Sequence, residues 1–206
     1  MRIFVFALLI SMLSSAAAQT AQFNNTFPLR DGIYVTHNEL LNNAPSFPNC
    51  TLLVNVNTYE INKEELSYCY KGMEDQVMPY TSELFAIVQN GKFFIYYENQ
   101  LLPVFSKGTL CRFIHKRLVR TTSNNSAESE IKCDICILDI QTGEIYKLKK
   151  ETLGKSIKRD ASLYATYSNT KPGRKNKNLF RYISDFNTKN PTNIPIKEET
   201  TIAEEE

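Results

Sequence analysis

The segment ELFAIVQ-NG-KFFIYYEN (83–99) carries the strongest local fold signal in the chain. Asn90-Gly91 separates two apolar runs, and this pair favours a type I′ hairpin turn because both central residues need positive φ. Alternation along the second run gives each strand face two aromatic side chains. They are Phe94 and Tyr96 on one face and Phe93 and Tyr97 on the other. The segment therefore predicts an antiparallel hairpin.

Further strand and helix signals lie on both sides of this hairpin. Strands are predicted at 31–37, 51–61, 101–105, 110–119 and 130–140, and the last pairs with EIYKLKK (144–150) through a turn at Gly143. The T-x-x-E pattern of Thr36 to Glu39 starts a short helix. Apolar residues at helical spacing predict one helix at 151–167 and another after the basic loop 171–178. The fold class is α+β: an antiparallel β-meander of about seven strands, a short N-terminal helix and two C-terminal helices.

The first 18 residues have the three parts of a secretory signal peptide. Arg2 is followed by an apolar run and then by small residues, with Ala16 and Ala18 forming an A-x-A cleavage site. The run of about 11 apolar residues is too short for a bilayer, which needs roughly 20. We expect a periplasmic or secreted protein with a flexible lead-in at 19–30, one globular domain at 31–187 and a flexible acidic tail at 188–206. No later segment is apolar enough to cross a membrane.

The five cysteines cannot all pair internally, and Cys69 with Cys111 is one candidate disulfide. Cys133 and Cys136 form a C-x-x-C pattern inside a strand-like segment. Alternation places them on opposite strand faces, so they do not easily bond each other. Cys133 shares its face with the isoleucines of that segment and is expected in the core. No second C-x-x-C and only two histidines occur, so no metal or other cofactor is predicted.

The formal charge of +2 hides an uneven distribution. Residues 150–181 carry 9 basic and 2 acidic side chains, a net charge of +7, whereas 182–206 carry 2 basic and 6 acidic, a net charge of −4. The basic block is a candidate polyanion-binding face. Its candidate contacts are Lys155, Lys158, Arg159, Lys171, Arg174, Lys175, Lys177 and Arg181. The alternative is a solvated helix face that the chain's own acidic tail neutralises.

Catalytic patterns are almost absent. A nucleophile would need a base, and only His37, in the helix cap, and His115, on a basic strand, are candidates. No G-x-S-x-G, H-E-x-x-H, P-loop or G-x-G-x-x-G motif occurs. An acidic cluster keeps glycosidase chemistry open as an alternative. It consists of Glu64, Glu65, Glu74, Asp75 and Glu83. No catalytic residue is assigned, and the sequence favours a protein that is not an enzyme.

Four segments together resemble a group of uncharacterised exported proteins of Bacteroidetes. They are DGIYVTHNELLNNAPSF, GKFFIYYENQLLPVFSKGTLCRF, DIQTGEIYKL and RYISDFNTKNP. The resemblance spans most of 31–192. It implies periplasmic or outer-surface residence and brings no assigned catalytic residue.

The leading functional hypothesis is an exported, non-enzymatic binding or structural module. Phe93, Tyr96 and Tyr97 could contact a sugar or a protein if they are exposed. Two alternatives stay open: polyanion binding through the basic block, and hydrolysis of a cell-surface polymer. The expected partner is a cell-surface glycan or another exported protein, and nucleic acid is not expected.

Overall fold

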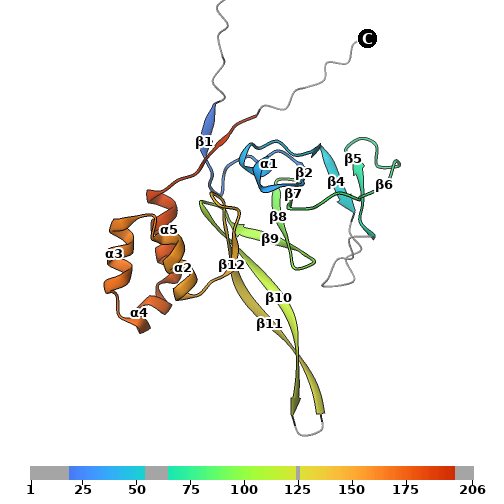
Figure 1. Cartoon of the computed structure of the whole chain (residues 1–206). Helices are drawn as coiled ribbons and strands as arrows, with labels where there is room; N and C mark the ends of the chain where they lie inside the picture. The colour runs from blue at the N-terminus through green and yellow to red at the C-terminus, as the bar shows by residue number, and fades with distance from the viewer. Residues whose placement is uncertain (1–18, 54–64, 124–125, 198–206) are drawn as a thin grey trace, which may run out of the picture.

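A computed structural model describes residues 19–53, 65–123 and 126–197 (Figure 1). The predicted signal peptide, most of the strand predicted at 51–61 and the Glu-rich end of the chain lie outside these ranges. No helix in the described ranges is long and apolar enough to cross a membrane.

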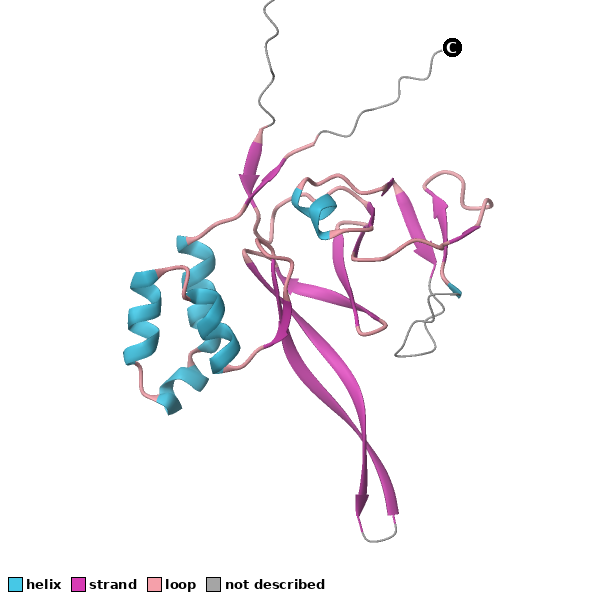
Figure 2. Ribbon diagram, viewed as in Figure 1, coloured by secondary structure: helices cyan, strands magenta, loops and turns pink. Residues whose placement is uncertain are grey.

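The described residues form thirteen strands and five helices in mixed α+β order (Figure 2). The strands are β1 (Thr20–Gln22), β2 (Gly32–Tyr34), β3 (Phe47–Pro48), β4 (Cys50–Leu53), β5 (Ser67–Tyr70), β6 (Met78–Pro79), β7 (Ala86–Gln89), β8 (Lys92–Tyr97), β9 (Gln100–Ser106), β10 (Leu110–Ser123), β11 (Ser126–Asp139), β12 (Ile145–Lys147) and β13 (Asn193–Pro195). The helices are α1 (His37–Leu41), α2 (Lys150–Ile157), α3 (Ala161–Asn169), α4 (Pro172–Lys177) and α5 (Leu179–Lys189).

The strands pair antiparallel in three sheets. The largest has eight strands in the order β12-β11-β10-β9-β8-β7-β2-β3, so β7 to β12 form the predicted meander. β4, β5 and β6 form a separate three-stranded sheet, and β1 pairs with β13. The number of strands thus exceeds the prediction of about seven, because short edge strands leave little periodic signal.

The hairpin at Asn90-Gly91 forms as predicted. Gln89 pairs with Lys92, and Asn90 and Gly91 have φ of 52° and 69°, the positive values that a type I′ turn needs. The carboxylate of Asp31 accepts hydrogen bonds from the N–H groups of Asn90 and Gly91, each at 3.1 Å. The turn is therefore tied to the residue that precedes β2.

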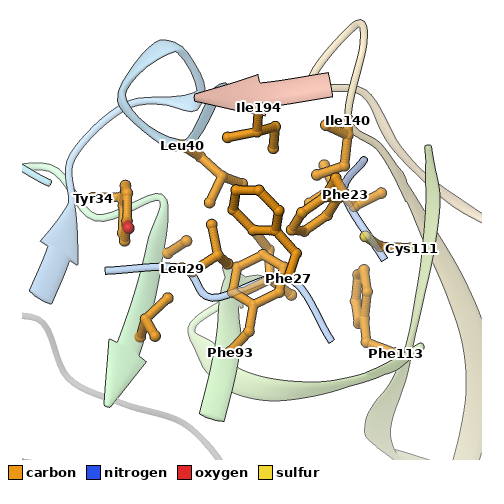
Figure 3. Close-up of a cluster of buried hydrophobic side chains, with 14 of the residues drawn as sticks. Phe23, Phe27, Leu29, Tyr34, Leu40, Phe93, Cys111, Phe113, Ile140 and Ile194 are labelled. Atoms are coloured by element: carbon orange, nitrogen blue, oxygen red, sulfur yellow. The ribbon is translucent and has the colours of Figure 1, made fainter. Parts of the chain in front are cut away.

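The base of the long β10–β11 hairpin separates two hydrophobic cores. Its two strands have fourteen residues each, and the hairpin extends beyond the rest of the molecule (Figures 1 and 2). On one face Leu110 and Ile137 pack with residues of α2, α3 and α5. On the other face four residues join the larger core: Cys111, Phe113, Cys136 and Leu138. Figure 3 shows this core and labels Cys111 and Phe113 together with side chains from β2, α1 and β8.

Four helices, rather than the two predicted, follow the sheet. The helix predicted at 151–167 is divided into α2 and α3, because Asp160 caps a new helix by accepting a hydrogen bond from the N–H of Leu163 at 2.8 Å. The basic loop predicted at 171–178 contains α4, which Pro172 begins at a position where its missing N–H costs nothing. Short helices of this kind depend on tertiary packing more than on local propensity.

Both ends of the described chain pack against the body. β1 pairs with β13, and Phe23, Phe27 and Leu29 are buried in the larger core. Ile194 of β13 is buried in the same core. The residues predicted as a flexible lead-in and the first part of the predicted flexible tail are therefore ordered parts of the fold, and the folded unit extends beyond 31–187.

The cysteines are arranged differently from the prediction. All five are free thiols, so the candidate Cys69–Cys111 bridge is not formed; the two residues lie in different sheets. Cys133 is exposed, not in the core, and Cys136 is the buried member of the pair. The strand alternation was predicted correctly, but the helices cover only the base of that face. Farther out, Leu118 on the same face is 61% exposed.

Gly32 is the position where an added methyl group would do most harm. Its φ is 144°, and a Cβ built there would lie 2.3 Å from the carbonyl oxygen of Phe47 on β3. We predict that Gly32→Ala lowers the free energy of unfolding by about 3–4 kcal/mol, because backbone must move as well as adopt a strained φ. Gly91→Ala is the matched control: its φ is also positive, but no atom lies within 4 Å. It should cost about 1–2 kcal/mol. Urea denaturation measures both, and equal losses would contradict the account.

Candidate anion-binding site

Helices α2, α3 and α4 border an open recess of about 450 Å³, called here the lysine recess. Four lysines and one carboxylate, Glu151, line it together with small and aromatic side chains. The lining residues are Lys150, Glu151, Gly154, Lys155, Lys158, Tyr164, Tyr167, Ser168, Pro172 and Lys175. The recess therefore has a net positive charge that a single acidic group offsets only in part.

Tyr167 fixes the geometry of the lysine recess. Its hydroxyl donates a hydrogen bond to the carbonyl oxygen of Lys150 at the start of α2, and its ring packs edge-on against Tyr182 of α5 with the centroids 4.9 Å apart. Gly154 allows this approach, since a Cβ there would lie 3.2 Å from the Tyr167 ring. Burial raises the pKa of Tyr167, so the hydroxyl stays a donor at neutral pH. Packing of α2 on α3 thus holds the recess open.

The lysines of the recess keep most of their charge available. Lys175 lies over the Tyr167 ring, with Nζ 4.8 Å from the centroid, and donates to the carbonyl oxygen of Ser168 at 3.2 Å. Lys150 lies 3.5 Å from the exposed carboxylate of Glu151, a surface pair that holds its partners weakly. Lys155 and Lys158 are exposed, and within the described part of the chain they have no ion-pair partner. All four ammonium groups can therefore turn toward an incoming anion.

The structure divides the eight candidate polyanion contacts into three groups. Lys155, Lys158 and Lys175 line the recess. Lys171, Arg174 and Lys177 are exposed at or within α4, where they extend the basic surface. Of the other two, Arg159 is held by the buried Asp139, whereas Arg181 forms only a weak surface pair with Asp185 and does not line the recess. Lys150 belongs to the recess although it was not among the eight; its place in the +7 segment was the signal that could have identified it.

Arg159 serves the fold rather than the recess. It forms an ion pair with Asp139, donates to Gln141 Oε1 at 3.0 Å and lies over the Phe186 ring at 5.2 Å. Asp139 is 2% exposed, and its burial raises the pKa of the carboxyl while the Arg159 charge lowers it. Arg181 is farther from its acidic neighbour, with Nε 3.7 Å from Asp185 one turn along α5.

Neither histidine is arranged as a catalytic base. Nε2 of His37 lies 2.7 Å from the carbonyl oxygen of Ile140. His115 is buried beside Glu98, with 3.3 Å between Nε2 and the carboxylate, and Cys136 lies one diagonal position away on the same face. Burial raises the pKa of the Cys136 thiol to about 11, so this thiol is protonated at neutral pH and is a poor nucleophile. The described residues contain no metal-binding group of three or more His, Cys, Asp or Glu side chains.

The described acidic residues of the predicted cluster lie at the surface. Glu64 lies outside the described ranges, and Glu65, Glu74, Asp75 and Glu83 are exposed. The carboxylate of Glu74 accepts a hydrogen bond from the N–H of Gly72 at 2.9 Å, which lowers the pKa of Glu74. A general acid would need a raised pKa, so Glu74 has the opposite character.

The aromatic residues of β8 are mostly covered. Phe93 is buried in the larger core, and Tyr97 packs edge-on against Phe113 and His115. The half-buried Tyr96 donates a hydrogen bond to Asn99 Oδ1 at 3.0 Å. The expected sugar-stacking surface on β8 is therefore not present in this form.

Comparison of the chain with protein-family models, with curated proteins and with solved structures gives no match.

The contrast between Arg159 and its neighbour Lys158 gives a test. We predict that Arg159→Gln lowers the free energy of unfolding by about 2 kcal/mol at pH 7, because Asp139 keeps a buried charge without its cation. Without Arg159 the pKa of Asp139 rises further, so protonation removes the penalty and the loss shrinks toward pH 4. Lys158→Gln removes an exposed charge and should change stability by less than about 0.5 kcal/mol at both pH values. Denaturation at pH 7 and pH 4 measures this, and a loss for Arg159→Gln that does not depend on pH would contradict it.

Proposed function

We propose that this protein is an exported, non-enzymatic binding module that attaches to an anionic polymer through the lysine recess. The observation that carries the proposal is the convergence of four lysines from α2 and α4 on one recess with a single carboxylate. Like charges repel one another when they are brought together. A multivalent anion that binds among the four lysines relieves this repulsion, so the cluster favours binding of such an anion. Export rests on the sequence of residues 1–18.

The surroundings of the recess favour a chain-like ligand over a single ion. Lys171, Arg174 and Lys177 continue the basic surface from the recess along α4. An anionic group in the recess would leave its neighbours along a polymer close to these three side chains. A cell-surface glycan that carries sulfate, carboxylate or phosphate groups has the required repeat of charges.

Lysine suits this function better than arginine would. Its ammonium is a compact charge on a flexible stem, which adapts to anionic groups without demanding one geometry. Binding of this kind selects for charge density rather than for a particular sugar. It weakens as salt rises because added salt screens the charges and reduces the entropy gained when counterions are released.

The test compares two triple variants with the same change of net charge. Lys155→Gln/Lys158→Gln/Lys175→Gln empties the recess of three cations, whereas Lys71→Gln/Lys92→Gln/Lys116→Gln removes three exposed lysines elsewhere. Affinity for a heparin oligosaccharide is measured by fluorescence titration from 50 to 300 mM salt. We predict that the recess variant binds at least tenfold more weakly, with the slope of log K against log salt reduced by about two to three.

The control triple should stay within about threefold of the unchanged protein at every salt concentration. Equal losses in the two triples would mean that net charge alone attracts the polymer, and they would overturn the recess as the binding site. Failure of the unchanged protein to bind at 50 mM salt would overturn the proposed function itself.

A further inference from the structure

A second recess, of about 330 Å³, lies where the segment after β1, the turn before β10 and helix α5 meet. It shares no residue with the lysine recess and is called here the arginine recess. Its lining consists of two cations, amide and hydroxyl side chains, and few apolar groups. The lining residues are Gln22, Phe23, Asn24, Asn25, Ser106, Lys107, Gly108, Arg112, Ile183, Ser184, Asn187 and Thr188. No carboxylate is among these described residues.

Arg112 is held in place by two aromatic rings, and among the described residues no acid forms an ion pair with it. Its guanidinium carbon lies 5.3 Å from the ring centroid of Phe105 and 5.1 Å from that of Phe180. Both rings are large exposed hydrophobic groups, at 50% and 47% exposure. Nε of Arg112 is buried and has no hydrogen-bond partner in the described structure. A buried donor without an acceptor costs free energy. A carboxylate that binds the guanidinium side-on, with one oxygen accepting from Nε itself, would remove this cost.

Lys107 supplies the second charge. Its Nζ donates to the carbonyl oxygen of Phe27 at 3.0 Å, and its backbone N–H donates to Asn25 Oδ1 at 2.7 Å. These bonds fix the residue at the edge of the recess. Burial lowers the pKa of Lys107, because desolvation disfavours its charged ammonium form. An anion in the recess would stabilise that charged form.

Asn187 makes the wall of the recess rigid. Its side chain accepts a hydrogen bond from the N–H of Leu110 at 2.8 Å and donates to the carbonyl oxygen of the same residue at 3.1 Å. Gly108 allows α5 to approach this closely, because a Cβ there would lie 2.4 Å from Asn187 Nδ2. The recess is therefore formed before any ligand arrives, which lowers the entropy cost of binding.

We propose that the arginine recess binds a small hydroxylated carboxylate of monosaccharide size, such as a uronic acid. The planar fork of Arg112 matches a carboxylate, and Lys107 adds a second charge. The amide of Gln22 and the hydroxyls of Ser106 and Ser184 suit the hydroxyl groups of a sugar ring. A volume of about 330 Å³ lies at the lower end of the usual range for small-molecule sites. This site is independent of the lysine recess and of the proposed polymer binding.

Isothermal titration calorimetry with four probes tests the ligand chemistry. D-glucuronate combines the carboxylate with hydroxyls, D-glucose lacks the charge, acetate lacks the hydroxyls, and inorganic phosphate is a charged ion of different shape. We predict saturable binding of D-glucuronate, with each of the other three at least tenfold weaker. Phosphate or acetate binding as tight as that of D-glucuronate would overturn the assignment of a sugar acid.

Two variants and two controls test the location. Arg112→Gln should weaken D-glucuronate binding at least tenfold, and Lys116→Gln, on the same strand but outside the recess, should leave it unchanged. Because Arg112→Gln could disturb packing, Ser184→Glu places a carboxylate from exposed Ser184 of α5 in the recess and should also abolish binding. Unchanged binding by Ser184→Glu would overturn the site. Heparin binding by Ser184→Glu should persist, because the two recesses are separate. If the lysine-recess triple lost D-glucuronate binding, the sugar acid would bind in the lysine recess instead, and the proposed site would be wrong.

Discussion

The opposite faces of the β10–β11 base bury different sets of side chains, and the helices, the larger core and both candidate sites depend on this arrangement. Alternation along the paired strands sends Leu110 and Ile137 toward the helices and their neighbours Cys111 and Leu138 toward the larger core. A fully buried side chain of this size contributes roughly 1.5–3 kcal/mol. The strand pair therefore links two cores, neither of which extends past it. Where the helices end, the same strand face becomes exposed, as at Leu118.

Both candidate sites lie on the helical side of this strand pair and depend on how the helices are attached to it. α5 rests on Leu110 and is joined to it through Asn187, which also forms a wall of the arginine recess. Asp139, at the end of β11, holds Arg159 and with it the end of α2. Residues 150–181 therefore contain two kinds of basic residue. Some attach the helices to the sheet, and others are left to face a ligand. A charge count alone cannot separate these two kinds.

The sequence predicted the features that arise from short-range geometry. The Asn90-Gly91 turn, the meander around it and the opposite orientations of Cys133 and Cys136 all follow from local φ preferences and strand alternation. It could not predict how far the helices cover the β10–β11 face, so Cys133 was wrongly placed in the core. The sequence also did not predict that both ends of the described chain are folded. Phe23 is buried there, and the pairing of β1 with β13 joins residues about 170 positions apart. The sequence identified three of the four lysines that line the lysine recess. It could not predict that they converge, because their convergence depends on the break between α2 and α3 at Asp160.

Native-state hydrogen exchange of the β10–β11 amides tests most directly whether the two-sided base organises the fold. We predict that the amides of Cys111, Phe113 and Leu138 exchange only through global unfolding, with opening free energies equal to that from denaturant unfolding. Amides of Lys116 to Leu118, which lie beyond the helices, should open locally at a cost at least about 2 kcal/mol lower, although the same strands pair there without interruption. Uniform protection along both strands, or a base that opens as easily as the outer part, would contradict a fold organised by the two-sided base of this hairpin.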